Sequence, residues 1–254
     1  MIYPDWPAPE NVQALTTTRK GGVSRGPWAS LNLADHVGDD PLAVQENRRH
    51  LHQSQQLPAE PLWLKQVQGD DVAEVALYAS QPGRDSRAVP QIEPPRADAS
   101  IVRGSGQVSA VLTADCLPVL FCERSGRCAA AAHAGWRGLA AGVLERTVQV
   151  MGIDPAELLV WLGPAIGPQA FEVGDEVRSV FVARHTQSAD AFTLYSPGHW
   201  LADLYHLARI RLAGVGVSAV YGGDRCTFTE DRDFYSYRRD GVTGRMATLI
   251  WLSS

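Results

Sequence analysis

Two apolar runs separated by a short polar turn dominate the middle of the chain. Residues 108–122 and 127–133 are rich in Ala, Val, Leu and Cys, whereas residues 123–126 are polar and include a glycine. Such a pattern is typical of two buried strands joined by a tight turn. Residues 135–152 follow with apolar positions at helical spacing. The sequence therefore predicts a hairpin that leads directly into a helix.

The expected pairing of this hairpin places a thiol beside an imidazole. If Cys122 pairs with Arg127 across the turn, Cys116 lies opposite His133. Directly opposed residues of an antiparallel pair share one face, with Cβ atoms about 4.5–5.5 Å apart. A soft metal-ligand pair needs this arrangement, and so does a cysteine nucleophile with its base.

The other patterns indicate strands and helices in a mixed order. A short β-branched strand precedes Arg19, and Asp39 or Asp40 can cap a helix that starts at Pro41. Residues 61–77 indicate two strand pieces around Gly69-Asp70, and Asp98 precedes another strand at 99–103. Further strand patterns lie at 158–162, 218–223, 226–229, 234–239 and 244–252, and helix patterns lie at 173–184 and 199–217. Hairpins beside strand–helix units predict an α/β mixed (α+β) fold, a layered sandwich of mixed β-sheets covered by helices. We expect one domain over residues 1–254.

Composition and charge exclude several classes of protein. The 254 residues are 45% hydrophobic with a net charge of −5, which argues against a broad nucleic-acid surface or a polybasic membrane anchor. We expect no signal peptide and no membrane span, and hence a cytoplasmic protein. Four cysteines occur without a CxxC pair, and Cys122 and Cys128 are predicted to be buried free thiols. Residues 78–97 are rich in proline and predict a long loop, either a surface insertion or a lid.

Three cationic or titratable residues in loops and turns are candidates for ligand binding. Arg19 precedes the Gly21–Gly22 turn, where it is either a solvated cation or an anion-binding group. His36 lies in a loop, as a structural residue or as a ligand. Arg137 lies at the start of the helix after His133, where free N–H groups favour an anion.

Several motifs, TADCLPVLF and HAGWRGLAAGV above all, make the chain resemble a known family. Others are TTRKGGVS, SLNLADHVGD, WLKQV, WLGPAIGP, GGDRCT and FYSYRRD. The sequence resembles the YfiH family, also called the multicopper polyphenol oxidase (laccase-like) or peptidoglycan editing factor family. The resemblance implies a fold like that of cytotoxic-necrotizing-factor toxin domains. It also implies a metal site, usually zinc, with Cys116 and His133 as two ligands.

The third ligand position departs from the family pattern. The family has QVHG, whereas this chain has Gln66-Val67-Gln68-Gly69, so Gln68 stands at the expected histidine. An amide oxygen is a poor ligand for zinc, so we expect weakened zinc affinity and reduced activity. Three explanations stay open: an engineered substitution, a natural variant that uses another ligand such as His36, or a homologue that has lost catalysis.

The resemblance implies a zinc-dependent purine nucleoside phosphorylase that acts on adenosine, inosine and methylthioadenosine, with adenosine deaminase side activity. Asp115 and Asp98 are then candidates for moving protons. Phosphate and substrate binding are assigned to Arg19, Arg137, His36 and Asn32. The expected partners are a small-molecule nucleoside and phosphate, and the oligomeric state stays open.

Three alternative functions also remain. The first is a peptidoglycan-precursor editing amidohydrolase, with Cys116 as nucleophile or zinc-bound water as the attacking group. The second is a copper-dependent phenol oxidase, for which copper replaces zinc. The third is a binding protein that has kept the fold and lost the metal.

Overall fold

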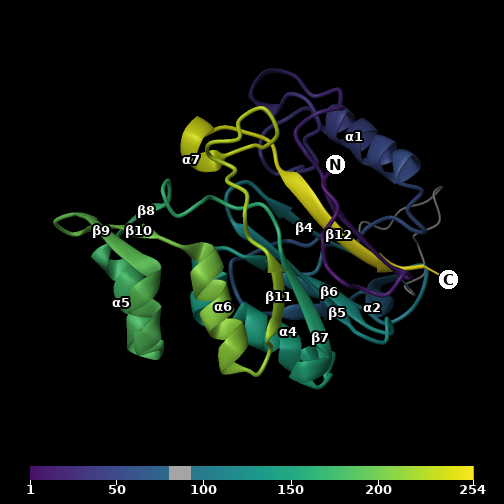
Figure 1. Ribbon diagram of the computed structural model, residues 1–254. Helices are drawn as coiled ribbons and strands as arrows, with labels where there is room; N and C mark the ends of the chain where they lie inside the picture. Colours follow the sequence, from purple (N-terminus) through teal and green to yellow (C-terminus); the bar gives the residue numbers. More distant parts are fainter. Residues whose placement is uncertain (80–92, 254) are drawn as a thin grey trace.

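The computed structural model describes residues 1–79 and 93–253, and a six-stranded mixed sheet lies at its centre (Figure 1). The strand order is β11-β7-β5-β6-β3-β2. The strands are β2 (Val72–Glu74), β3 (Ala99–Val102), β5 (Leu117–Glu123), β6 (Ala129–Ala134), β7 (Leu158–Leu162) and β11 (Ala219–Gly222). The outer pairs β2–β3 and β7–β11 are parallel, while β3, β6, β5 and β7 pair antiparallel.

A second, antiparallel sheet has the order β1-β12-β4. Its strands are β1 (Val12–Thr16), β4 (Val108–Thr113) and β12 (Met246–Leu252). One apolar cluster joins residues such as Val111 and Ile250 of this sheet to Leu120 and Ala131 of the six-stranded sheet. The two sheets therefore pack face to face.

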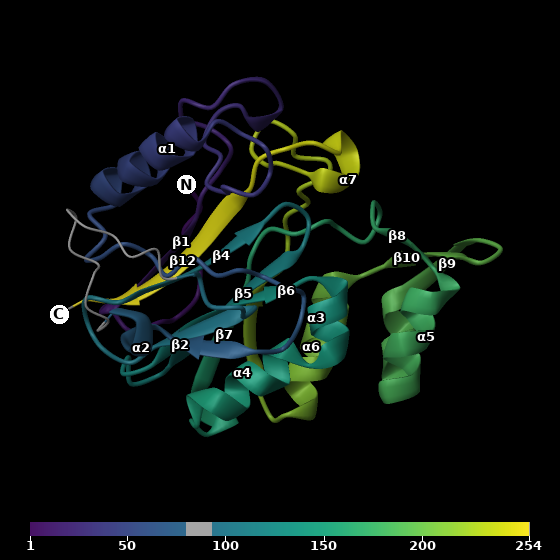
Figure 2. The same ribbon diagram turned by 180° about the vertical axis from the view of Figure 1, so that it is seen from behind.

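Helices cover the outer face of each sheet (Figures 1 and 2). On the six-stranded sheet lie α3 (Trp136–Ala141), α4 (Val143–Met151) and α6 (Leu204–Gly214), which share a core with β5, β6 and β7. On the three-stranded sheet lies α1 (Pro41–Ser54), which contributes Leu51 to a core with Leu15 and Leu249. These layers confirm the expected mixed α/β sandwich.

A small lobe projects from the body beside α6 (Figure 2). It contains the sheet β8-β10-β9 and α5 (Asp175–Arg184). The strands are β8 (Glu172–Gly174), β9 (Phe192–Ser196) and β10 (His199–Ala202), and the 3₁₀ helix η3 (Thr186–Ala191) joins α5 to β9. The remaining short elements are η1 (Gly26–Trp28), α2 (Val75–Ala79), η2 (Pro155–Glu157) and α7 (Tyr237–Asp240).

The central hairpin forms, but its register and extent differ from the prediction. Cys122 pairs with Ala129, and His133 lies opposite Pro118 rather than Cys116. The turn is longer than expected because the N–H of Glu123 bonds the carbonyl of Cys128 at 2.9 Å. The shift is two positions, so Cys116 keeps the parity of the face that carries His133. The predicted strand 108–122 is also broken at residues 114–116, and its two halves, β4 and β5, lie in different sheets.

The predicted helix over 135–152 is two helices. Gly142 separates α3 from α4 with φ 112°, a left-handed conformation that glycine adopts without steric cost. The predicted start of α1 is confirmed, since Asp40 caps it by accepting a hydrogen bond from the N–H of Leu42 at 3.0 Å. Asp39 instead accepts hydrogen bonds from Ser24 and Asn32.

The C-terminal third of the chain differs in part from the predicted elements. Strands at 219–222 and 246–252 are confirmed, and α5 and α6 form as predicted helices. Residues 199–202 form β10 instead of the start of α6, because Asp203 caps that helix later, at the N–H of His206. Cys226 forms an isolated bridge with Ala165 and residues 227–229 form a turn, while residues 237–240 form α7 where a strand is predicted. Most of the predicted loop over 78–97 falls at residues 80–92, outside the described residues.

None of the helices described here combines the length and the apolar character that crossing a membrane would require.

Candidate active site

Cys116 and His133 meet where β5 and β6 reach the edge of the six-stranded sheet. Cys116 directly precedes β5 and is partly exposed, whereas His133, near the end of β6, is buried. Gly135 lies between them: a Cβ atom at that position would be 3.0 Å from the sulfur and 3.6 Å from Nε2 of His133. The imidazole therefore faces the thiol across a space that only glycine leaves open.

Asp98 fixes the other edge of the imidazole. Its carboxylate is fully buried and accepts a 2.8 Å hydrogen bond from Nδ1 of His133. The same carboxylate accepts hydrogen bonds from the consecutive backbone N–H groups of Val67, Gln68 and Gly69 at 3.1, 3.0 and 2.8 Å. Asp98 thus orients His133 and the loop of Gln68 together.

The charges in this cluster favour a protonated imidazole. Burial opposes the positive charge of His133, but the charge of Cys116 and hydrogen bonds with Asp98 and Cys116 outweigh it and raise the pKa of His133 to about 9. Burial also opposes the charge of Asp98, yet its hydrogen bonds from His133 and from the Gly69 N–H lower the pKa of that carboxyl. At neutral pH the site therefore holds an imidazolium between the sulfur of Cys116 and the carboxylate of Asp98.

A cavity of about 240 Å³ opens onto Cys116. It is lined by Gln68, Ala114, Asp115, Cys116, Trp136, Arg137, Ile166, Phe171, Leu204, Tyr237 and Arg238. Two guanidinium groups lie over aromatic rings in this lining: Arg137 is 4.4 Å from the ring centre of Trp136, and Arg238 is 5.4 Å from that of Phe171. The cavity thus combines apolar walls with two cations, which suits a small planar ligand that carries an anion.

Sequence reasoning missed part of this lining. Arg238 and Tyr237 come from α7, and Phe171 comes from the start of the projecting lobe, so three distant segments meet at Cys116. The motif FYSYRRD held a signal, since two arginines beside aromatic residues are unusual for a buried strand. A further cation, Arg245, lies near Cys116 and Asp115: burial lowers its pKa, and the charges of those two groups oppose that effect.

Asp115 lines the cavity and also makes hydrogen bonds that join two segments of the chain. Its carboxylate accepts hydrogen bonds from Thr227 Oγ1 and from the backbone N–H of Arg238, both at 2.7 Å. Asp115 itself has φ 89°, in the left-handed region. These bonds tie the segment before Cys116 to the segment that carries Arg238. The predicted proton-transfer roles of Asp115 and Asp98 stay predictions.

Arg19, Asn32 and His36 do not line this cavity. Arg19 donates to the carbonyls of Ala29 and Asp231, and its guanidinium lies 4.8 Å from the ring centre of Tyr235. Asn32 is buried and its amide bonds the backbone of Ala34 in its own loop and the backbone N–H of Arg245. His36 is exposed and lies 3.4 Å from Asp35. The ligand-binding roles proposed for these three side chains stay predictions.

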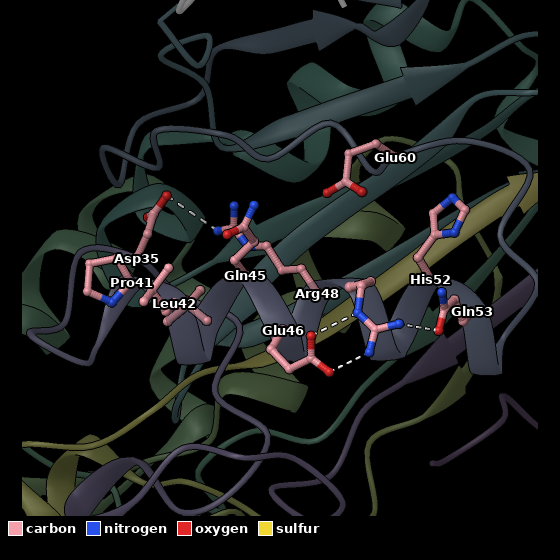
Figure 3. A pocket seen from close by; sticks show the side chains of 11 residues that line it. Asp35, Pro41, Leu42, Gln45, Glu46, Arg48, His52, Gln53 and Glu60 are labelled. Carbon is pink, nitrogen blue, oxygen red and sulfur yellow. Dashed lines mark hydrogen bonds and ion pairs between the residues drawn. The ribbon is translucent and has the colours of Figure 1, made fainter. Parts of the chain in front are cut away.

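A larger cavity of about 920 Å³ follows the outer face of α1 (Figure 3). Its lining is polar and self-paired: Asp35 lies 3.5 Å from Arg48, and Arg49 bonds both Glu46 and Gln53. It contains no cysteine, and both of its arginines are already paired with carboxylates. We therefore place the candidate active site at the smaller cavity, which contains the thiol.

Comparison with known proteins identifies the family. The sequence profile described as "multi-copper polyphenol oxidoreductase laccase" matches residues 13–253. The chain belongs to this laccase-like family. The relatives include a purine nucleoside phosphorylase of Pseudomonas aeruginosa, 56% identical over 99% of this chain and 98% of the relative. Another is purine nucleoside phosphorylase YfiH of Escherichia coli, 53% identical over the same shares of the two chains.

Solved structures agree with the assignment to the laccase-like family. A Neisseria meningitidis protein of family DUF152 superposes with a TM-score of 0.91 at 49% identity, covering 100% of this chain and 99% of that one. YlmD from Geobacillus stearothermophilus superposes with a TM-score of 0.88 at 34% identity, covering 96% and 93%. The resemblance noted from the motifs is therefore confirmed.

The donor set of this family member does not fit a three-ligand metal centre. Over residues 1–79 and 93–253, no three His, Cys, Asp or Glu side chains are grouped so that they could hold a metal ion. Cys116 and His133 are two suitable donors, but Asp98 and Asp115 are committed to other hydrogen bonds. The amide of Gln68 lies 3.4 Å from Nη1 of Arg137. A multicopper cluster has still less support in this donor set.

Proposed function

We propose that the chain is a purine nucleoside phosphorylase. The observation that carries this proposal is the agreement of two features. Relatives that share 53% to 56% identity over nearly the whole chain are named purine nucleoside phosphorylases. The cavity beside Cys116 offers aromatic and aliphatic walls for a purine and two arginines for phosphate.

In the proposed reaction, the residues of the site bind phosphate, supply a proton and orient the imidazole. Arg137 and Arg238 hold phosphate so that one of its oxygens attacks C1′ of the nucleoside. The C1′–N9 bond breaks, its electron pair passes to the purine, and the base takes up a proton. The imidazolium of His133, whose pKa is raised to about 9, supplies that proton through the neighbouring Cys116 thiol. Asp98 keeps the imidazole oriented and charged.

The proposed substrates are adenosine, inosine and methylthioadenosine, with deamination of adenosine as a side activity, in the cytoplasm. For zinc we propose weakened binding, since this chain offers Cys116 and His133 as ligands without the family's second histidine. Each step of the proposed phosphorolysis is carried by residues of the chain.

Phosphorolysis is tested by following free base and ribose 1-phosphate from each of the three nucleosides, with and without phosphate. We expect both products only with phosphate, and ammonia from adenosine at a lower rate. Arg238→Met should raise the KM for phosphate about tenfold, the size expected for loss of one charge-assisted hydrogen bond. Arg232→Met, at an exposed position of the preceding turn, is the matched control. A rate of base release that does not depend on phosphate would contradict the proposal.

One observation favours a second function, amide hydrolysis. Cys116, His133 and Asp98 stand in the order of a nucleophile, a base and an orienting carboxylate, with no third metal ligand among the described residues. The Cys116 thiolate would attack an amide carbon of a peptidoglycan precursor, His133 would protonate the departing amine, and water would cleave the thioester. A thioester-linked peptide trapped at Cys116 and detected by mass spectrometry would establish this function. Phosphate-dependent turnover without such a species would favour phosphorolysis.

A further inference from the structure

Gln68 and Arg137 form a polar pair on the cavity wall beside Cys116. Gln68 stands in the left-handed region with φ 61°, where its backbone N–H bonds Asp98. Its side-chain Oε1 accepts a 3.4 Å hydrogen bond from Nη1 of Arg137. The guanidinium of Arg137 is held in turn over the ring of Trp136. Gln68 is thus anchored through its backbone and Arg137 through the Trp136 ring, while both side chains are exposed at the cavity.

This pairing decides which end of the Gln68 amide faces the cavity. A guanidinium only donates hydrogen bonds, so the carbonyl oxygen of the amide must face Arg137. The Nε2 group of Gln68 has no hydrogen-bond partner among the described residues of the chain. The wall therefore presents the amide N–H groups and the guanidinium, all of them donors.

The surrounding charges favour an anion at this wall. The carboxylate of Asp98 is occupied by His133 and three backbone N–H groups, and that of Asp115 by Thr227 and the Arg238 N–H. Arg238 lies in the same cavity lining; its Nη1 donates to the carbonyl of Glu172 at 2.9 Å, and its other N–H groups add a second guanidinium to the wall. The donors of this wall, together with its positive charge, match a tetrahedral oxyanion.

We propose that Gln68 and Arg137 together bind inorganic phosphate beside the thiol of Cys116. In this role Gln68 is a hydrogen-bond donor to the anion, at the position where the family pattern has a metal-ligating histidine. The inference rests on the proposed phosphorolysis for the identity of the anion as a reactant. It gives Gln68 a binding function that is separate from any metal.

The test measures how phosphate protects Cys116 from alkylation by iodoacetamide at constant pH. Mass spectrometry of the Cys116 peptide gives the rate, and the Cys226 peptide is the internal reference. Phosphate should slow alkylation of the unmodified protein. In Gln68→Met the half-protecting phosphate concentration should rise about tenfold, the loss expected for one hydrogen bond to a charged group. Gln45→Met, in the cavity along α1 shown in Figure 3, should leave the half-protecting phosphate concentration unchanged.

The same alkylation experiment is repeated with zinc in place of phosphate. Zinc should protect Cys116 in Gln68→His at concentrations that leave the unmodified protein reactive. Equal zinc protection of the two proteins, or unchanged phosphate protection in Gln68→Met, would overturn the inference. A parallel assay for ribose 1-phosphate separates the two proposals. Phosphate protection that depends on Gln68 but comes without turnover supports the anion site and disproves phosphorolysis; turnover with unchanged protection in Gln68→Met disproves only the role of Gln68.

Discussion

Asp98 and His133 form a buried ion pair, with Nδ1 of the imidazole 2.8 Å from Oδ1 of the carboxylate. The pair links the two halves of the site, because Asp98 also holds the N–H groups of residues 67–69, while His133 faces Cys116. A single buried carboxylate thus sets the position of the imidazole and of the loop that carries Gln68.

Replacement of Asp98 by asparagine should destabilise the fold and loosen the site together. The amide nitrogen would face backbone donors and leave a buried imidazolium without its counter-charge. We expect a loss of about 2–4 kcal/mol in the free energy of unfolding, measured by urea denaturation. Asp70→Asn, at an exposed position of the same loop, should change it by less than about 0.5 kcal/mol. Equal effects of the two substitutions would show that Asp98 does not organise the loop.

The raised pKa of His133 predicts how stability depends on pH. A group whose folded pKa, about 9, exceeds its ordinary value of 6.5 binds its proton more tightly in the folded state. The contribution of His133 to the free energy of unfolding is complete below pH 6.5 and is lost as the pH rises through 9. The difference in unfolding free energy between the unmodified protein and His133→Gln should therefore shrink by about 2–3 kcal/mol between pH 6 and pH 9.5. The exposed His50→Gln serves as control, and a difference that stays constant over this range would refute the assignment.

The proximity of Cys116 and His133 could be predicted from the sequence because the apolar runs on both sides of the turn are unambiguous. The register could not, since it depends on one turn hydrogen bond, between Glu123 and Cys128, that no periodicity encodes. A register shift of two residues keeps every side chain on its face, so Cys116 and His133 still share one face.

Local sequence patterns could not predict which residues surround Cys116 and His133. Asp98 binds a loop about thirty residues before it, and Asp115 binds Thr227 across 112 residues. Phe171, Tyr237 and Arg238 reach the cavity from separate elements whose packing places them there. Gln68 could be singled out only by the family pattern. The contact between Gln68 and Arg137 is seen only in the structure.

Gly135 should be essential for the geometry of the thiol but not for folding. A Cβ at this position would lie 3.0 Å from the Cys116 sulfur and 3.5 Å from Cε1 of His133. Gly135→Ala should therefore displace the thiol and reduce nucleoside turnover at least about tenfold, while it costs about 1–3 kcal/mol of stability. Gly214→Ala, where a Cβ meets nothing within 4 Å, should keep full activity. Activity assays and thermal melts of both variants give the comparison. Normal turnover in Gly135→Ala would mean that the thiol tolerates the shift.

The left-handed backbone at Gln68 predicts a substitution that separates stability from ligand binding. Glutamine is rare at φ 61°, whereas asparagine tolerates this region. Gln68→Asn should therefore raise the free energy of unfolding by about 0.5–1 kcal/mol, a part of the left-handed cost, while its shorter side chain no longer reaches Arg137 and phosphate binding weakens. Gln66→Asn makes a matched control, because Gln66 bonds both backbone groups of Leu112 and its shortening should lower stability. Urea denaturation and phosphate protection of Cys116 distinguish the two effects. A Gln68→Asn protein that is less stable than the unmodified chain would show that backbone strain is not the controlling factor at this position.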